Sequence, residues 1–212
     1  MNISGDLILL IIVISGVAML QFYRGRKINL AIMKSLANGF EKSLDIKDKL
    51  YTWIGGYSGF KADYEMKDKT IRKIELTLTL LPRQSFFWLP FSFLLRRGDR
   101  LYIVIKPEIK MIRDVHIIKR FFYPFGAGIK ERKALKKDSY ERKFYSLYEE
   151  EEDVKNLMKI VESSIDVKRL RHIAIVKETN VLYCLIKPDP LKTPAELKKL
   201  VENFKENVRC FM

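Results

Sequence analysis

Few residues of this chain have side chains suited to acid–base or metal chemistry. His116 and His172 are the only histidines, and each lies in an apolar run without a cysteine or carboxylate at a ligand spacing. Cys184 and Cys210 form no CxxC pair, so neither a disulfide framework nor a zinc site is expected. We interpret the histidines as structural and both cysteines as small core residues. The sequence therefore predicts no metal site, no cofactor and no catalytic residues.

The glycine-rich and acidic motifs also have structural interpretations. Residues 54–59 read IGGYSG but lack the Lys-Ser/Thr ending of a phosphate loop, so we expect a bend in a strand. The acidic run at 149–153 precedes apolar residues at helical spacing, and carboxylates there complement the positive end of a helix. That run predicts a helix start and not a metal site. A membrane-tethered enzyme with an unfamiliar site is the least favoured hypothesis, and we expect no enzyme.

Positive charge interleaved with aromatic residues distinguishes the middle of the chain. The protein has 40 Lys and Arg against 26 acids, and residues 119–143 alone hold nine of these cations. Such a stretch is typical of surfaces that bind the phosphates of anionic lipid headgroups or of RNA, and a solvated basic loop is the remaining alternative. The residues predicted to contact the ribosome or another anionic surface are Lys119, Arg120, Lys130, Arg132, Lys133, Lys136 and Lys137.

A second apolar segment, RQSFFWLPFSFLLRRG, occupies residues 83–98. Its ten or so apolar residues would cover about 16 Å as a helix, roughly half the hydrocarbon thickness of a bilayer, so a second membrane span is not expected. A buried core helix and a surface facing the membrane or a partner both remain open. The residues predicted to make that membrane or partner contact are Phe86, Phe87, Trp88, Leu89, Phe91, Phe93, Leu94 and Leu95.

The N-terminus predicts a membrane anchor. Residues 7–23 are uncharged, and the first 23 residues carry no Lys or Arg, which favours a retained anchor over a cleaved signal peptide. Arg24, Arg26 and Lys27 follow at once, so the positive-inside rule places the N-terminus outside and the rest in the cytosol. We expect a transmembrane anchor with its basic flank at 1–27 and one cytosolic domain at 28–212.

The elements behind the anchor predict an α+β domain, in which a mainly antiparallel sheet packs with helices. A helix is expected to end near Asp45, a second to follow the acidic run, and a third to start at Thr193 with a capping box completed by Glu196. A hairpin is expected to turn at 178–180. The other predicted strands are residues 51–66, 71–81, 99–107, 113–121 and 140–148.

The order of these elements resembles a known family. The strand LYTWIGG is followed by an alternating strand that runs directly into LLPRQSFFWLPFSFLL and then by DRLYIVIKP. This order resembles the calumin family, the coiled-coil-domain subunits of the eukaryotic PAT complex, and RLRHIAIVKETNVLYCLIKPDP with its following helix is similar to that family's last strand pair and helix. The resemblance extends over most of residues 28–210, and Arg83-Gln84 with its flanks forms its compact motif.

The resemblance implies a non-enzymatic role. Family members lie beside the protein-conducting channel and the translating ribosome, hold a small membrane partner of the Asterix type, and shelter polar transmembrane segments of client proteins during insertion. The apolar segment would then contact the partner or membrane lipids, and the basic stretch ribosomal RNA. The acidic lumenal region and the coiled-coil tail of the family are missing, so calcium binding is not carried over and an archaeal relative is expected. A domain that binds anionic lipid headgroups is the alternative function.

Overall fold

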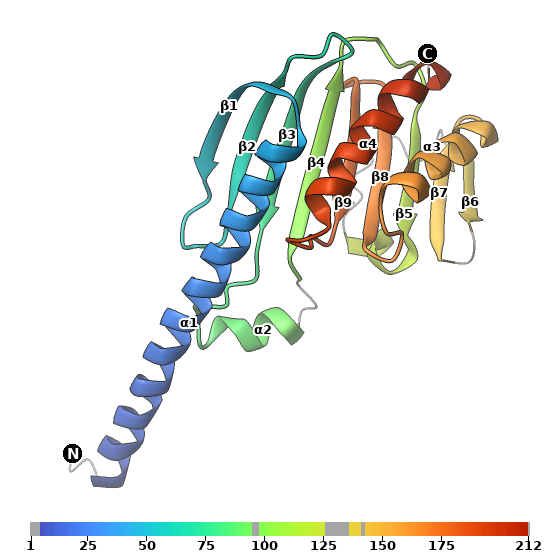
Figure 1. Cartoon of the computed structure of the whole chain (residues 1–212). Helices are drawn as coiled ribbons and strands as arrows, with labels where there is room; N and C mark the ends of the chain where they lie inside the picture. The colour runs from blue at the N-terminus through green and yellow to red at the C-terminus, as the bar shows by residue number, and fades with distance from the viewer. Residues whose placement is uncertain (1–4, 95–97, 126–135, 141–142, 212) are drawn as a thin grey trace.

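The computed structural model describes residues 5–94, 98–125, 136–140 and 143–211. Nine strands in these residues form one antiparallel sheet, in the order β1-β2-β3-β4-β9-β8-β5-β7-β6 (Figure 1). The expected α+β fold with a mainly antiparallel sheet is confirmed. The strands are β1 (Ile46–Trp53), β2 (Gly59–Met66), β3 (Ile71–Thr79), β4 (Arg100–Pro107), β5 (Val115–Lys119), β6 (Lys136–Tyr140), β7 (Phe144–Tyr148), β8 (Leu170–Val176) and β9 (Val181–Ile186).

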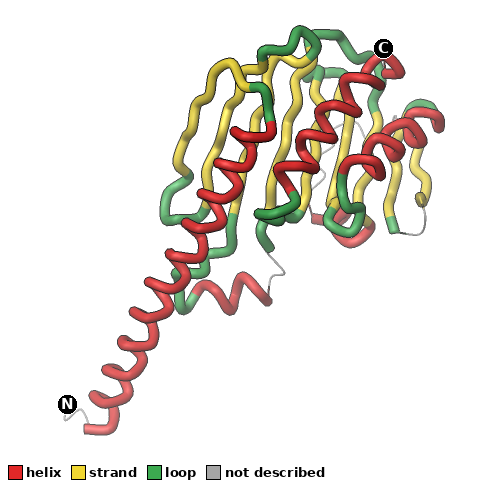
Figure 2. Tube along the Cα trace, viewed as in Figure 1, coloured by secondary structure: helices red, strands yellow, loops and turns green. Residues whose placement is uncertain are grey.

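Helices cover one face of this sheet. The C-terminal half of α1 (Gly5–Ser43), together with α3 (Glu151–Ser164) and α4 (Thr193–Asn207), lies across it (Figure 2). The short helix α2 (Trp88–Leu94) connects β3 to β4 and lies outside this layer. Two 3-10 helices, η1 (Arg120–Phe125) and η2 (Val208–Phe211), follow β5 and α4.

The core forms where the alternating strands meet the helices. In β3, Ile74, Leu76 and Leu78 are buried against the helical layer, while the residues between them point to the opposite face. There Lys73 forms ion pairs with Asp63 and Glu75. The period of two in the sequence thus places apolar residues on the covered face and charged residues on the solvated one.

Helix α1 changes character along its length. In the sheet-bound half, Gly25, Asn29, Met33, Leu36 and Phe40 are buried at helical spacing. The N-terminal half is apolar and exposed, and α1 is the one helix in the described residues long and apolar enough to span a membrane. The helix continues without a break through residue 27, where we placed the boundary between anchor and domain.

Most local predictions are confirmed. The helix that leaves the anchor ends at Ser43, two residues before Asp45, and the acidic run leads into α3. Strands β8 and β9 pair as the predicted hairpin, in which Asn180 adopts a left-handed turn conformation with φ of 52°.

Three local predictions are wrong. Residues 54–58 form a hairpin turn between β1 and β2 and not a bend within one strand. Thr193 is the first residue of α4 and its hydroxyl accepts a hydrogen bond from the backbone N–H of Asp189 (2.8 Å), while Glu196 pairs with Arg169, so no capping box forms. Part of the predicted basic loop is the edge strand β6, which pairs with β7.

Candidate functional site at one end of the sheet

The sheet has two distinct ends, because antiparallel strands start and finish alternately at each. We call the end from which the exposed half of α1 projects the near end, and the opposite one the far end. Helix α2 lies at the near end beside α1 (Figure 1). Each end is taken as the connections together with the two terminal residues of each strand. Among the described residues, the near end comprises 52–60, 78–94, 98–101, 118–125, 139–140, 143–145, 165–171 and 185–192, and the far end comprises 44–47, 65–72, 106–116, 136–137, 147–150, 175–182 and 208–211.

A polar cluster fastens α1 to the segment that leads into α2. Arg83 donates two hydrogen bonds to the Asp99 carboxylate, at 3.0 Å (Nη1 to Oδ1) and 2.6 Å (Nη2 to Oδ2), and a third to Asn29 Oδ1 at 3.0 Å. Asn29 Nδ2 donates to the carbonyl oxygens of Leu81 and Tyr57, both at 2.9 Å. Such a bidentate pair fixes both distance and orientation. We call Arg83, Asp99 and Asn29 the clamp.

Contacts beside the clamp bring the two backbones together. Gln21 Nε2 donates to the Arg83 carbonyl at 2.8 Å, and Gln84 donates to the Gly56 carbonyl. A Cβ on Gly25 would lie 2.1 Å from the Arg83 carbonyl oxygen, so only glycine allows this approach. The Arg83-Gln84 motif therefore positions α2 against α1 from within the fold.

Helix α2 exposes its apolar side chains, which resolves the alternative left open by the sequence. Leu89 and Phe86 are half-buried, and Ser92 is buried with its hydroxyl on the Trp88 carbonyl (2.9 Å). Leu95, Arg96 and Arg97 lie outside the described residues, as does the side chain of Phe93. The large exposed side chains are Phe87 (69% exposed), Trp88 (55%), Phe91 (55%) and Leu94 (78%).

The predicted basic residues do not all lie together. Lys119 and Arg120 are at the near end, where the Arg120 N–H donates to the Lys143 carbonyl (2.9 Å) and Lys119 Nζ donates to the Lys168 carbonyl (2.9 Å). Lys136 opens β6 at the far end, with Lys137 next to it in the strand. Lys130, Arg132 and Lys133 lie outside the described residues.

Charge separates the two ends. The near end holds ten cations against three acids among its described residues, whereas the far end holds eleven cations against eight acids. The cluster of near-end cations could not be recognised in the sequence because its members come from six separate segments. They are Arg83, Arg100, Lys119, Arg120, Lys143, Lys168, Arg169, Arg171, Lys187 and Lys192, and the acids are Asp99, Asp166 and Asp189.

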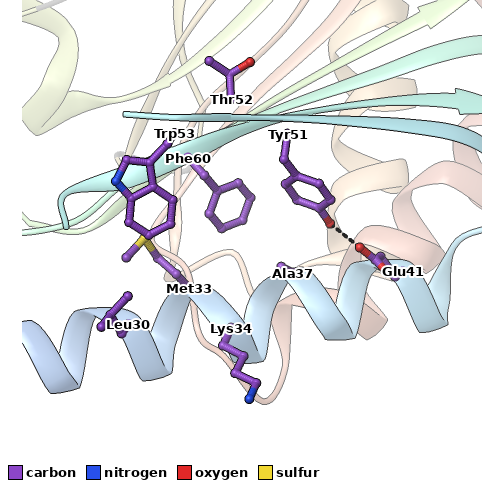
Figure 3. A pocket seen from close by; sticks show the side chains of 9 residues that line it. All are labelled: Leu30, Met33, Lys34, Ala37, Glu41, Tyr51, Thr52, Trp53 and Phe60. Atoms are coloured by element: carbon purple, nitrogen blue, oxygen red, sulfur yellow. Dashed lines mark hydrogen bonds between the residues drawn. The ribbon is translucent and has the colours of Figure 1, made fainter. Parts of the chain in front are cut away.

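An apolar groove of about 400 Å³ lies between α1 and the edge strand β1 (Figure 3). Trp53, Tyr51 and Phe60 point from the strands toward Leu30, Met33 and Ala37 of the helix, and Lys34, Glu41 and Thr52 complete the lining.

Tyr51 and Glu41 are hydrogen-bonded at one end of this groove (Figure 3). The Tyr51 hydroxyl donates to Glu41 at 2.7 Å, and Lys49 Nζ donates to the same carboxylate at 2.6 Å. These bonds lower the pKa of Glu41 below its ordinary value. Glu41 is thereby held as a carboxylate and is not available as a general acid.

The two histidines lie side by side in the sheet, and the two cysteines differ in exposure. His116 Nδ1 and His172 Nε2 lie 3.4 Å apart in neighbouring strands, and burial lowers both pKa values, that of His172 to about 3. Both rings are therefore neutral at pH 7. Cys184 is buried as expected, but Cys210 is exposed, so its assignment to the core is wrong. No group of three His, Cys, Asp or Glu side chains in the described residues could hold a metal ion.

The sequence analysis did not identify the side chains that bind Arg83 of the Arg83-Gln84 motif. Asn29 and Asp99 lie far from Arg83 in the chain, so no local pattern links them. The one signal in the sequence was Asn29 itself, a polar residue among the apolar residues that α1 buries.

Comparison of the chain with models of known protein families gives no match, and neither does comparison with curated proteins.

Proposed function

We propose that this chain is a non-enzymatic single-pass membrane protein of the translocon-associated type, which assists the insertion or chaperoning of multipass membrane proteins at the ribosome–channel complex. In this proposal α1 spans the membrane with its N-terminus outside, and the sheet domain lies in the cytoplasm. The membrane is the cell membrane of an archaeon, or that of the endoplasmic reticulum in a eukaryote.

The exposed apolar surface of α2 beside the anchor carries this proposal. Large apolar side chains grouped on a surface mark contacts with proteins or membranes. Because the clamp ties α2 to α1, the position of the anchor in a bilayer determines the position of α2 at its surface. Helix α2 is too short to span the bilayer, so it would lie at the interface, where transmembrane segments enter.

The partners follow from this placement. The α2 surface and the groove between α1 and β1 would receive a small membrane partner of the Asterix type, the protein-conducting channel, or transmembrane segments of client proteins. The groove is lined mainly by apolar side chains and extends to Trp53, the last residue of β1, at the near end. The basic residues would approach the ribosome and its RNA, or membrane lipids.

Site-specific photocrosslinking during translation tests the proposal. A photoreactive residue replaces Phe91 in the full chain, and ribosomes translate a multipass membrane protein into membranes that contain this variant. We expect crosslinks to the client's transmembrane segments or to a small membrane protein, and salt-sensitive sedimentation with ribosomes. The matched control is Lys61, an exposed residue of β2 on the solvated face, which should give no such crosslinks. Crosslinks to lipid alone without ribosome association would refute the proposal.

A further inference from the structure

Arg171 is a buried cation without a full set of partners. It lies at the start of β8, at the near end, with only 8% of its surface exposed. Its Nη1 has no hydrogen-bond partner among the described residues, and its guanidinium lies over the Phe122 ring at 4.8 Å. Burial lowers its pKa, and the neighbouring charge of Arg100 lowers it further. A buried charge normally has a counter-ion, because its lost hydration must be replaced.

The nearby acids already have partners. Asp99 receives two hydrogen bonds from Arg83, and Asp166 and Glu196 form ion pairs with Arg169. Asp189 accepts hydrogen bonds from the backbone N–H groups of Leu191 and Lys192. The charge of Asp99 also acts on Arg171, but its hydrogen bonds from side chains come from Arg83. No carboxylate among the described residues of this end therefore forms an ion pair with Arg171 or Arg100.

Other cations at this end come from neighbouring segments. Lys119 ends β5, Arg120 follows it, and Lys168 precedes β8, with Lys119 Nζ bonded to the Lys168 carbonyl. The Arg120 guanidinium lies over the Tyr145 ring at 5.4 Å. Gly98 lies against Arg171, since a Cβ there would be 3.0 Å from Nη2, so the cations adjoin the segment that follows α2.

We propose that the near end binds the phosphate of an anionic phospholipid headgroup, with Arg171 and Arg100 at the centre of the site. The occupant is a lipid because the apolar half of α1 projects from this same end and the exposed side chains of α2 lie next to it. When α1 spans a membrane, the near end faces the bilayer, so nucleic acid would have less access to it than lipid headgroups. The inference rests on the proposed function for one point only, that α1 spans a membrane.

Lipid selectivity of the full chain in nanodiscs tests this site. Both tryptophans, Trp53 and Trp88, lie at or beside the near end, so their fluorescence reports on it. Phosphatidylcholine discs receive small equal amounts of headgroup-spin-labelled phosphatidylglycerol or phosphatidylcholine, and tryptophan quenching gives the relative affinity. We expect the anionic label to be preferred about 25-fold at low salt, and the preference to fall about fivefold for each arginine removed.

Three variants make the result specific. Arg100→Gln with Arg171→Gln should abolish the preference, and Arg100→Gln with Arg120→Gln, which leaves the buried arginine in place, should reduce it if the first variant does not fold. Lys67→Gln with Lys69→Gln at the far end should leave it unchanged. Equal quenching by both labels, or binding of added ribosomes through the same arginines with no lipid preference, would overturn the inference. The quenching measurement itself contains no ribosome or client, so a missing lipid preference would leave the crosslinking test at Phe91 untouched.

Discussion

The near and far ends of the sheet differ although the same strands connect them. At the far end, cations and acids neutralise one another: Arg113 pairs with Glu150, Lys177 with Glu149 and Asp114, and Lys205 of α4 with Asp68. At the near end cations outnumber acids by ten to three, and exposed aromatic residues of α2 lie beside them. A surface that satisfies its own charges needs no partner, whereas an apolar and basic surface is typical of one that meets a membrane or a macromolecule.

The two ends also differ in how deeply their ion pairs are buried. Side chains of Arg83 and Asp99 are mostly buried, and their pair joins α1 to the α2 segment. The Arg113–Glu150 pair lies at the surface and joins two adjacent connections. A buried pair is costly to break, while an exposed pair contributes little.

Breaking the clamp should have the largest effect on stability. Asp99→Asn leaves the Arg83 guanidinium without its counter-charge in a mostly buried site, and we expect a loss of about 3 kcal/mol in the free energy of unfolding. Denaturant titration of the full chain in detergent, followed by tryptophan fluorescence, measures it. Glu150→Gln at the far end is the matched control and should cost much less, because its pair with Arg113 is exposed to solvent. Equal losses at both ends would contradict the distinction.

Removing the close backbone approach should have the next largest effect. In Gly25→Ala the new methyl group overlaps the Arg83 carbonyl oxygen, and the strain should cost about 2 kcal/mol. Gly16→Ala, whose Cβ meets nothing within 4 Å, controls for the change in helix propensity and should not destabilise. The same denaturant titration compares the two. An unchanged Gly25→Ala variant would mean that α1 and the α2 segment are not held together here.

Polar substitution on α2 should affect association and leave stability almost unchanged. Trp88→Ser and Phe91→Ser replace exposed side chains, so the free energy of unfolding should change by about 0.5 kcal/mol or less. Contact with the bilayer or a partner, measured by crosslinking from Leu94, should fall several-fold. Ile112→Ser, an equally exposed apolar residue at the far end, should change neither quantity. A loss of several kcal/mol on α2 would show that its surface is core.

The smallest effect is expected from pH at the far end. The hydrogen bond from Lys205, with one from the backbone N–H of Thr70, lowers the pKa of Asp68 from 3.8 to about 2. A lowered carboxyl pKa stabilises the fold above the unfolded value and loses that contribution as pH falls through the folded one. The stability difference between the native chain and Asp68→Asn should therefore be constant above pH 5 and shrink between pH 4 and 2. A difference that persists at pH 2 would contradict the assignment.

Local patterns predicted most of the elements because their information is local. Alternation in residues 71–81 indicated a half-buried strand, observed as β3 over Ile71–Thr79, and the acidic run before Val154 indicated a helix start. The capping box failed because Thr193 bonds to the preceding turn and Glu196 to Arg169, a partner 27 residues away. The edge strand β6 was missed because its sequence, KKDSY, has no apolar alternation.

The candidate site was predictable only in part. Residues 86–95 could be singled out from composition, but their exposure depends on which elements cover them, and that is a property of packing. Lys119 and Arg120 could be singled out because cations are dense in their stretch of sequence, and their contact with an anionic surface stays a prediction. Arg100 and Arg171 lie in strand-like runs whose alternation marks them only as strand residues.

The sequence by itself determined an apolar N-terminal helix, the succession of strands and helices, and a strongly basic chain, because hydrophobic period and charge are read from neighbouring residues. The tertiary structure decided that α2 is exposed, that Arg83 meets Asn29 and Asp99, and that cations from six segments gather at one end. These facts depend on strand direction and on contacts between residues far apart in the chain. An antiparallel sheet brings every second connection to the same end, and no local pattern records which residues meet there.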